Sequence, residues 1–148
     1  MKVKFKKSEV KEISKKLLNK ISKIKNKNAK VLAFSGNLGA GKTTLTQEIA
    51  KHLGIKEGII SPTFVIMKFY DIGKNSEYFN SFKKLIHIDA YRLDSHDDLM
   101  KLGWTELVEN KNNLIIVEWP ERVEKCFDDN TFSVKLAHVD EETRTIEF

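Results

Sequence analysis

The stretch VLAFSGNLGAGKTTLTQEIAKHLG, residues 31–54, decides the fold of this chain. It begins with the mostly apolar run Val31–Gly36, which is typical of a strand buried on both faces. It ends with an amphipathic helix pattern that stops at Gly54, a residue suited to cap a helix. The intervening Gly36–Thr43 fits the pattern G-x-x-x-x-G-K-[ST]. A buried strand, a glycine-rich loop and a helix in this order predict a loop that binds the phosphates of a nucleotide.

Each fixed residue of this loop has a chemical reason. Its glycines let the backbone wrap closely around phosphate and adopt positive φ angles. Lys42 is expected to reach the β- and γ-phosphates, and the hydroxyl of Thr43 to bind Mg²⁺. We therefore expect ATP or ADP and Mg²⁺ as cofactors. The cofactor-binding residues predicted in the loop are Gly36, Asn37, Leu38, Gly39, Ala40, Gly41, Lys42, Thr43 and Thr44.

Two further apolar runs, LIHID and LIIVE, each end in a carboxylate, at Asp89 and Glu118. Ligands of doubly wound α/β sheets sit at the carboxyl ends of the strands. Both acids are therefore expected at the same edge of the sheet as the phosphate loop. Mg²⁺ with several bound waters needs oxygen ligands or acceptors of this kind. The pattern predicts a metal role for at least one of the two, against the alternative of solvent-exposed acids at strand ends.

Strands and helices alternate along the rest of the chain, so the fold class is α/β. We expect a P-loop NTPase-like single domain over residues 1–148, with a mostly parallel central sheet flanked by helices and a C-terminal β-hairpin. The further elements predicted are a helix over residues 9–24 capped by Ser8, a strand over residues 63–72, two short helices capped by Asp94 or Ser95 and by Thr105, and a hairpin over residues 131–148.

The net charge of +5 is unevenly distributed. Residues 1–30 hold 12 lysines and 2 glutamates, whereas the remainder holds 14 basic and 19 acidic residues. The basic segment could dock RNA or an acidic protein, but a solvated helix face is favoured because no aromatic residue or arginine is interleaved for base stacking. Cys126 is the only cysteine, so no disulfide within the chain is possible. No apolar run approaches the length of a membrane span, and we expect a cytoplasmic protein without membrane contact.

The motifs GNLGAGKTT, SPTF, HIDAYRL and VEWPE occur in this order and spacing, and with them the chain resembles the bacterial TsaE (YjeE) family. These are small P-loop ATPases required for threonylcarbamoyladenosine modification of tRNA. The resemblance covers roughly Ser8 to Arg122 and departs at Asn37, where the family commonly has Asp. It implies ATP hydrolysis and protein partners in the threonylcarbamoyl-transfer complex. The absence of an obvious arginine finger predicts that this hydrolysis is slow. The resemblance leaves open whether the chain itself contacts tRNA.

The resemblance also implies roles for single residues. Thr63 of SPTF is similar to a switch residue that closes over the γ-phosphate. Asp89 is similar to the acid that orients the attacking water or the water shell of the metal, and Glu118 to the metal-side acid. Trp119 is implied in nucleotide-dependent activity, although a core tryptophan that anchors the strand end is an equal alternative. The predicted catalytic residues are thus Lys42, Thr63, Asp89 and Glu118, and the predicted metal ligands are Thr43 and Glu118.

Two arginines outside these motif roles have alternative interpretations. Arg144 follows the DEET turn of the terminal hairpin, which we expect beside the phosphate-loop edge of the sheet. An exposed guanidinium there could stack on adenine, so Arg144 and Trp119 complete the cofactor-binding prediction, but a cross-strand pair with an acid is the more ordinary outcome. Arg92 could pair with an acid or present a positive face to a partner.

Other functions were weighed against a slow ATPase. An autonomous small-molecule kinase needs several arginines to clamp its second substrate, and this chain has three, widely separated, with no arginine-rich lid. A GTPase is disfavoured because the guanine-specifying N-K-x-D motif is missing. A nucleotide-gated binding module with negligible hydrolysis remains open. The sequence is interpreted as an ATP-binding, slowly ATP-hydrolysing component of the tRNA threonylcarbamoyladenosine modification assembly.

Overall fold

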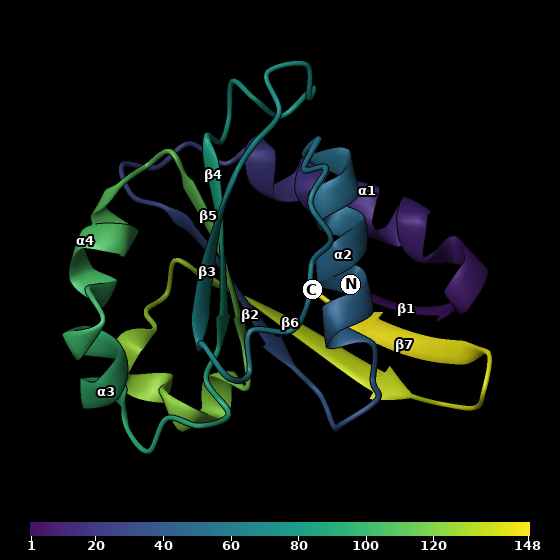
Figure 1. Cartoon of the computed structure of the whole chain (residues 1–148). Coiled ribbons are helices and arrows are strands. Elements are labelled where there is room, and N and C mark those ends of the chain that lie inside the picture. Colours follow the sequence, from purple (N-terminus) through teal and green to yellow (C-terminus); the bar gives the residue numbers. More distant parts are fainter.

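The chain is built around one sheet of seven strands in the order β1-β7-β6-β2-β5-β4-β3, and the computed structural model describes all of residues 1–148 (Figure 1). The four strands at its centre, β6, β2, β5 and β4, are parallel. The other pairs are antiparallel. The strands are β1 (Lys2–Lys6), β2 (Lys30–Ser35), β3 (Met67–Asp71), β4 (Lys84–Asp89), β5 (Asn113–Glu118), β6 (Thr131–His138) and β7 (Thr143–Glu147).

Helices cover both faces of the sheet, as predicted for this α/β class. Helices α1 (Val10–Ser22) and α2 (Lys42–His52) lie on one face, and α3 (His96–Lys101) and α4 (Trp104–Glu109) on the other (Figure 1). Three short 3₁₀ turns complete the chain, η1 (Lys7–Glu9), η2 (Pro120–Arg122) and η3 (Glu124–Cys126). None of the helices has both the length and the apolar composition that crossing a bilayer requires.

The uninterrupted apolar runs of the central strands follow from this layering. Leu114 and Ile116 of β5 belong to the larger core, which α1 and α2 close. Ile115 and Val117 belong to the second core, which α3 and α4 close. Because side chains alternate along a strand, a strand covered on both faces has no position for a solvent-exposed residue. The predicted buried strands ending at Asp89 and Glu118 are therefore confirmed.

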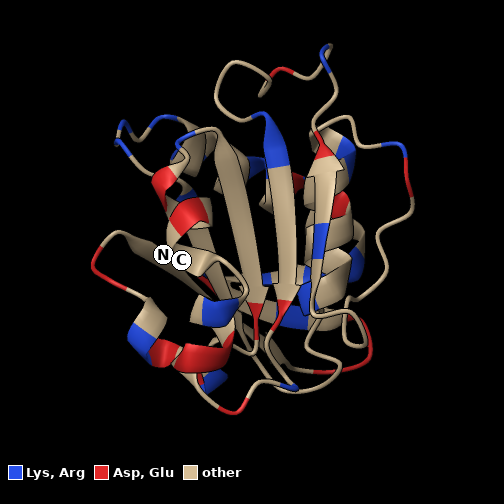
Figure 2. Cartoon of the chain, turned by 60° about the vertical axis from the view of Figure 1, so that its left-hand side comes forward, with Lys and Arg blue, Asp and Glu red and all other residues tan.

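The carboxyl ends of the parallel strands lie at one edge of the sheet. Asp89 and Glu118 are direct register partners at the ends of β4 and β5. In Figure 2, acidic residues mark the lower ends of two central strands, and basic residues lie on several connections at the upper end, together with some acidic ones. The lower edge is thus where the carboxylates of the two strand ends meet.

Strand β1 was not predicted. Its sequence KVKFK contains only two apolar residues, and Phe5 alone is buried. It forms because β7 returns from the terminal hairpin and offers a free edge, with Phe5 opposite Arg144 in the antiparallel register. The hairpin over residues 131–148 is confirmed as β6 and β7. The sheet is consequently parallel at its centre and antiparallel toward both edges.

Several predicted helix and strand boundaries were wrong. Ser8 lies within η1, and the residue before α1 is Glu9, whose carboxylate accepts from the Lys6 N–H at 2.7 Å. Thr105 lies inside α4, because the chain turns at Gly103, with a φ of +91°, to begin that helix. Ser95 does precede α3, although its side chain makes no capping hydrogen bond. Gly54 follows α2 with a φ of +68°, as expected of a residue that ends a helix.

The predicted strand over residues 63–72 was also too long. Only β3 is extended, because residues 61–66 form a tight turn instead. The Pro62 carbonyl accepts hydrogen bonds from the N–H groups of Val65 and Ile66. Ile66 has a φ of +68°, a left-handed conformation that is rare for a β-branched residue. The apolar residues of this segment therefore do not continue the sheet.

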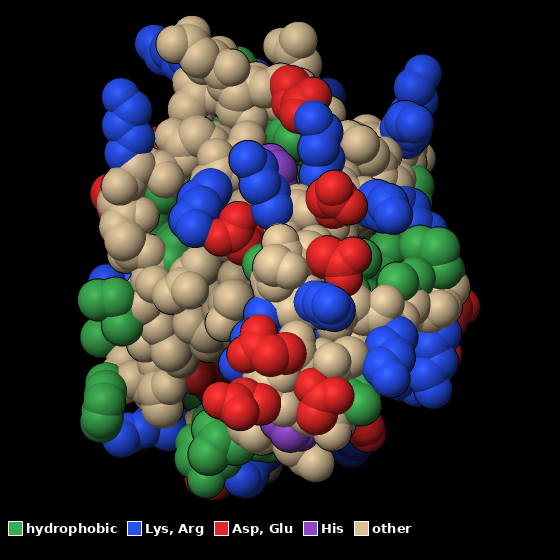
Figure 3. Space-filling view, turned by 90° about the vertical axis from the view of Figure 1, so that its right-hand side faces the viewer, with side chains coloured by type: hydrophobic (Ala, Val, Ile, Leu, Met, Phe, Trp, Pro, Cys, Tyr) green, Lys and Arg blue, Asp and Glu red, His purple; other side chains and the backbone are tan.

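The lysine-rich N-terminal segment forms β1, η1 and α1. In Figure 3, which views the side of the molecule that carries α1 and α2, basic and acidic side chains are intermixed. Some are paired across segments, such as Lys15 of α1 with Glu77 at 3.4 Å. The basic charge of this segment is thus partly balanced by acids from elsewhere in the chain, which supports the interpretation as a solvated helix face.

Candidate nucleotide site

The phosphate loop joins β2 to α2 with the backbone conformation that the glycine pattern predicted. Gly36, Gly39 and Gly41 have φ angles of +147°, +80° and +104°. At Gly36 there is a second constraint, because a Cβ atom would lie 2.4 Å from the carbonyl oxygen of Leu136 in β6. The loop therefore needs glycine both for its turns and for its close approach to the neighbouring strand.

Lys42 begins α2 and is folded back into the loop. Its Nζ donates hydrogen bonds to the carbonyl oxygens of Gly36 and Asn37, and lies 4.3 Å from the centre of the Trp119 ring. The side chain is only 5% exposed. Burial lowers the pKa of Lys42, while nearby carboxylates, Glu118 foremost, act in the opposite direction. A buried ammonium that is bonded only to neutral carbonyl groups would be stabilised by a phosphate, because the phosphate carries the opposite charge.

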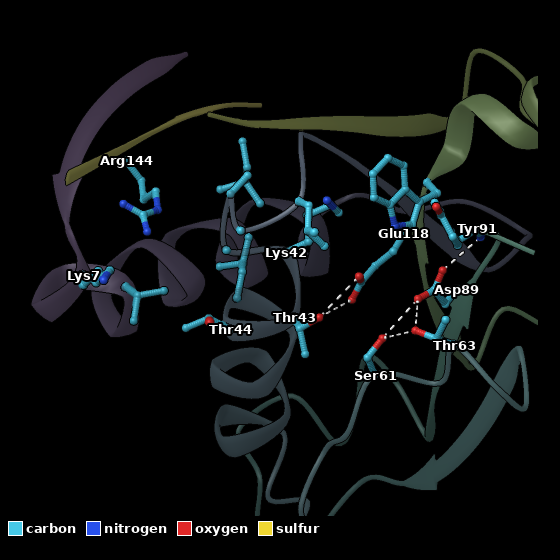
Figure 4. Close-up of a pocket in the computed structure, with 18 of the residues that line it drawn as sticks. Lys7, Lys42, Thr43, Thr44, Ser61, Thr63, Asp89, Tyr91, Glu118 and Arg144 are labelled. Atoms are coloured by element: carbon cyan, nitrogen blue, oxygen red, sulfur yellow. Dashed lines mark hydrogen bonds between the residues drawn. The ribbon is translucent and has the colours of Figure 1, made fainter. Parts of the chain in front are cut away.

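Glu118 ends β5 and connects three segments of the chain. The Thr43 hydroxyl donates to its carboxylate, at 3.2 Å from Oε1 and 3.4 Å from Oε2. On the other side, Nε2 of the fully buried His87 lies 2.8 Å from Oε1. The Nδ1 atom of His87 has no partner, so the arrangement fits a ring that carries its proton on Nε2 and donates to Glu118. The two predicted metal ligands, Thr43 and Glu118, are thus in direct contact (Figure 4).

Asp89 ends β4 and holds the segment that contains SPTF. Its Oδ2 accepts from the hydroxyls of Thr63 at 2.9 Å and Ser61 at 3.1 Å, and these hydroxyls lie 2.9 Å apart (Figure 4). Its Oδ1 accepts from the Tyr91 N–H at 3.0 Å. Asp89 is 2% exposed. The predicted switch residue is therefore bound, through Asp89, to the edge of the sheet that carries the phosphate loop.

Trp119 and Pro120 explain how the chain leaves the buried strand. Trp119 has a φ of +57°, and Pro120 begins η2 directly after it. Such a conformation costs roughly 1–3 kcal/mol in a residue other than glycine and persists where surrounding contacts impose it. Those contacts are the Lys42 ammonium and the Tyr91 ring, whose centre is 5.1 Å from that of Trp119. Trp119 is half-buried, lies over the loop and also packs against the core that α3 and α4 close, so both alternatives agree with the structure.

Neither alternative for Arg144 agrees with the structure. Arg144 is 8% exposed, and its guanidinium donates to the carbonyl oxygens of Asp140 at 2.6 Å and Thr143 at 2.9 Å. The reason is the unpredicted β1, which pairs with β7 and makes it an interior strand. The hydrogen-bond partners are backbone carbonyls, so the alternative of a cross-strand acid does not hold either.

One pocket of about 800 Å³ joins all of these groups. Figure 4 shows Asp89, Glu118 and Thr63 on one side of Thr43, and Lys7 and Arg144 on the other. The half beyond Thr44 is lined by β1, η1 and the terminal hairpin, through residues that include Phe5, Lys7 and Arg144. The pocket is large enough for a nucleotide, with oxygen-rich groups at one end and an apolar wall with two cations at the other.

Comparison with known proteins places the chain among relatives of one kind. The sequence profile of the family described as Threonylcarbamoyl adenosine biosynthesis protein TsaE matches residues 6–146. The chain belongs to the TsaE family. The resemblance drawn from its four motifs is confirmed, and it extends further than expected, since the match includes the terminal hairpin.

Individual relatives agree with this assignment. Proteins named tRNA threonylcarbamoyladenosine biosynthesis protein TsaE include one from Rickettsia prowazekii, 34% identical over 135 residues, covering 88% of this chain and 87% of that protein. One from Bacillus subtilis is 33% identical over 118 residues, or 80% of this chain and 68% of that protein. One from Rickettsia felis is 36% identical over 77% of this chain, and the match spans 61% of its own length. The crystal structure of Bacillus subtilis YdiB matches 99% of this chain and 83% of its own with a TM-score of 0.69 and 28% identity.

Some site residues of this TsaE chain could not be assigned from the motifs. His87 has no role in any of the motifs, yet it is bonded to Glu118. The sequence did offer one signal for His87, a polar residue inside an otherwise apolar buried strand. A buried polar side chain normally has a hydrogen-bond partner. Ser61 was not given a role of its own although it shares Asp89 with Thr63. Arg92 has no acidic partner and instead lies 4.6 Å from the Phe64 ring centre, outside the pocket.

Proposed function

We propose that this TsaE-family chain binds ATP with Mg²⁺ at Gly36–Thr44 and hydrolyses it slowly, as a component of the assembly that makes threonylcarbamoyladenosine in tRNA. The observation that carries the proposal is the contact between Thr43 and Glu118. It brings a carboxylate from the end of β5 onto the first turn of α2, directly beside a loop whose backbone can bind phosphate. The names of the relatives support the place of this activity in tRNA modification.

The phosphates would be bound mainly by groups of the loop. The N–H groups of such a loop and the first turn of the helix that follows it stabilise an anion. The Lys42 ammonium would exchange the carbonyl oxygens of Gly36 and Asn37 for the β- and γ-phosphates. The half of the pocket beyond Thr44, with Phe5 and Arg144, would then receive the base and ribose. In this arrangement Arg144 contacts the nucleoside from its present position, without leaving its hairpin.

The residues around Thr43 fit Mg²⁺. The chain has no group of three or more histidine, cysteine or acidic side chains that could hold a metal by itself. Mg²⁺ bound to a nucleotide usually keeps several waters and takes only one or two protein oxygens. The Thr43 hydroxyl and the Glu118 carboxylate offer these. The ion would neutralise negative charge on the β- and γ-phosphates.

Hydrolysis would depend on Asp89 and Thr63. Both hydroxyls of the SPTF segment now occupy one oxygen of Asp89. In the proposed cycle Thr63 turns toward the γ-phosphate, and the released Asp89 oxygen accepts a hydrogen bond from the attacking water. A carboxylate in this place orients the nucleophile rather than binding the nucleotide. The SPTF segment would thereby differ between the ATP and ADP states.

Slow turnover follows from where the arginines lie. Only Arg144 lines the pocket, and its guanidinium is held by carbonyl groups of its own hairpin. Arg92 and Arg122 lie against the rings of Phe64 and Tyr91. None is positioned to stabilise charge on the transferred phosphoryl group, a task for which an arginine contributes roughly 10³–10⁵-fold in rate. The autonomous kinase is therefore not favoured.

The test is steady-state ATP hydrolysis by the pure protein, repeated with its threonylcarbamoyl-transfer partners. We expect a rate well below the roughly 1–100 s⁻¹ of kinases, and an increase when the partners are added. An Asp89→Asn variant should bind ATP and lose the stimulated rate. A kinase-like rate from the isolated chain, unchanged by partners, would replace this proposal with the autonomous phosphotransferase. Binding without any hydrolysis, even with partners, would indicate a nucleotide-gated module.

A further inference from the structure

A second pocket lies at the opposite end of the sheet, where the parallel strands β2, β4 and β5 begin. It has a volume of about 220 Å³. It is formed by the connection from α1 to β2 and by the segments that precede β4 and β5, at the top of Figure 1, while the phosphate loop is at the bottom. Its polar lining consists of amide, hydroxyl and ammonium groups, without a carboxylate. The lysines and asparagines involved are Lys25, Lys30, Lys111, Asn26, Asn80 and Asn112.

Lys30 is the unusual member of this set. It is the first residue of β2, and its side chain shares a face of the strand with Leu32 and Phe34, in the layer that α1 closes. Only 6% of Lys30 is exposed, and its Nζ, which forms no hydrogen bond or ion pair within the chain, keeps access to solvent at the pocket that it lines. Burial lowers the pKa of Lys30. The stem of Lys30 is thus held within the fold while its ammonium opens to the pocket, where an anion would supply the partner that the chain does not.

The surroundings add charge of the same sign. The three segments that meet at this end, residues 22–30, 80–84 and 110–112, contain seven lysines and no aspartate or glutamate. One of these lysines, Lys84, is paired with Asp71 at 2.9 Å. The carboxyl end of α1, at Ser22, contributes a partial negative charge equivalent to roughly half an electron. That dipole is too small to balance the lysines, so the pocket is electropositive.

We propose that this pocket binds a phosphate group, at a site separate from the nucleotide site. The ammonium groups of Lys25, Lys30 and Lys111, from two of the three segments, would supply charge, and the asparagine amides would supply directed N–H donors. The pocket is smaller than the roughly 300–1,000 Å³ of sites for drug-sized ligands, which suits a single phosphate rather than a nucleotide. The phosphate could belong to a small metabolite or to the backbone of an RNA, and the experiment below separates these sources.

The first measurement is an NMR titration of the ¹⁵N-labelled full chain with inorganic phosphate. Amide signals are read residue by residue, so binding at the phosphate loop is seen separately and does not affect the outcome. We expect shifts at residues 24–30 and 110–112, with Lys30→Met and Lys111→Met each weakening this binding by on the order of tenfold. Lys27→Met is the matched control, because Lys27 is exposed on the same connection, outside the pocket lining.

Two results would overturn the proposal. The first is a titration in which phosphate moves only signals of the phosphate loop. The second is an equal loss of affinity in Lys27→Met, because that would mean a diffuse basic surface instead of a built site. The same variants are then tested for retention of unmodified tRNA. If Lys30→Met retains less tRNA than Lys27→Met does, the phosphate belongs to RNA. If the two variants retain tRNA equally while the wild type binds inorganic phosphate at this pocket, the phosphate belongs to a small molecule.

Discussion

Glu118 is the residue on which the proposed nucleotide site depends. Its carboxylate is almost fully buried, contacts the first turn of α2 through Thr43, and is held from behind by His87. An apolar strand ends in a carboxylate here because β5 delivers that group to the carboxyl edge of the sheet. Since both partners of Glu118 come from other segments, its orientation is fixed before any metal or nucleotide arrives.

His87 is accordingly predicted to act as a positioning residue. His87→Leu should raise the Mg²⁺ concentration needed for half-maximal activity by roughly 10- to 100-fold, the usual cost of removing a group that orients a metal ligand. His87→Gln, which can place an amide N–H near the same point, should restore much of that loss. A purely structural role would instead lower thermal stability in both variants and leave the Mg²⁺ dependence unchanged.

Trp119 provides a direct report on the loop. Nucleotide binding should draw Lys42 away from its ring, so the emission of Trp119 should change when ATP or ADP with Mg²⁺ is added. The only other tryptophan, Trp104, is buried among α4 and η3 on the far side of the sheet. Trp104→Phe should keep the response and Trp119→Phe should abolish it. If instead Trp104→Phe abolished the response and Trp119→Phe kept it, the change on nucleotide binding would lie away from this site.

At the scale of residues, the sequence was informative where chemistry imposes a pattern. Gly36, Lys42 and Thr43 are recognisable because phosphate binding dictates their types and spacing. His87 and Arg144 were not, because their partners are set by tertiary contacts. Arg144 became buried only when β1 paired with β7, and His87 found Glu118 on the neighbouring strand. Such information is absent from any local stretch of residues.

Among the elements, the turn at residues 61–66 has the features that the proposed switch requires. It carries the left-handed Ile66, whose carbonyl accepts from the Asp89 N–H at 2.8 Å, and two hydroxyls bonded to the Asp89 carboxylate. It also exposes Phe64 and Val65, at 82% and 59%. A strained turn held by a few exchangeable hydrogen bonds can adopt a second arrangement at modest cost.

Thr63→Val tests this switching role, since it keeps the shape of the side chain and removes the hydroxyl. We expect ATP affinity within a few-fold of the wild type, but single-turnover hydrolysis slower by roughly 10²-fold, a typical cost of losing one donor to the transition state. Ser61→Ala serves as the comparison, because it removes the other hydroxyl bonded to Asp89 and should have the smaller effect. Equal rates in Thr63→Val and the wild type would contradict the role given to Thr63.

The elements themselves were predictable to different degrees. The strand, loop and helix of residues 31–54 follow from local sequence. The spacing of the apolar residues and the positions of the glycines there predict the same three elements. Strand β1 and the turn before β3 do not. KVKFK has too few apolar residues to indicate a strand, and TFVIMKFYDI has a strand-like composition throughout, although Pro62 and Ile66 turn its first part. Strand β1 depends on its pairing with β7, and the turn depends on the hydrogen bonds of residues 61–66 with Asp89.

For the molecule as a whole, the sheet separates two sites of different character. At the carboxyl ends of β2, β4 and β5, the buried carboxylates of Asp89 and Glu118 and the ammonium of Lys42 line the proposed nucleotide pocket. At their amino ends, Lys30 and its neighbours form the smaller electropositive pocket. The rigid strands between them are covered on both faces. A ligand at one end therefore has no steric access to the other, and the two sites can be tested independently.

The central claim is that Lys42 and its loop bind Mg-ATP, and calorimetric titration tests it most directly. The wild type should bind one ATP per chain with a measurable heat. Lys42→Ala should lose roughly 2–3 kcal/mol of binding free energy, or about 30- to 150-fold in affinity. Lys51→Ala, which removes an exposed lysine paired with Glu48 on the same helix, should bind as the wild type does. No saturable binding by the wild type, or unchanged affinity in Lys42→Ala, would contradict the account.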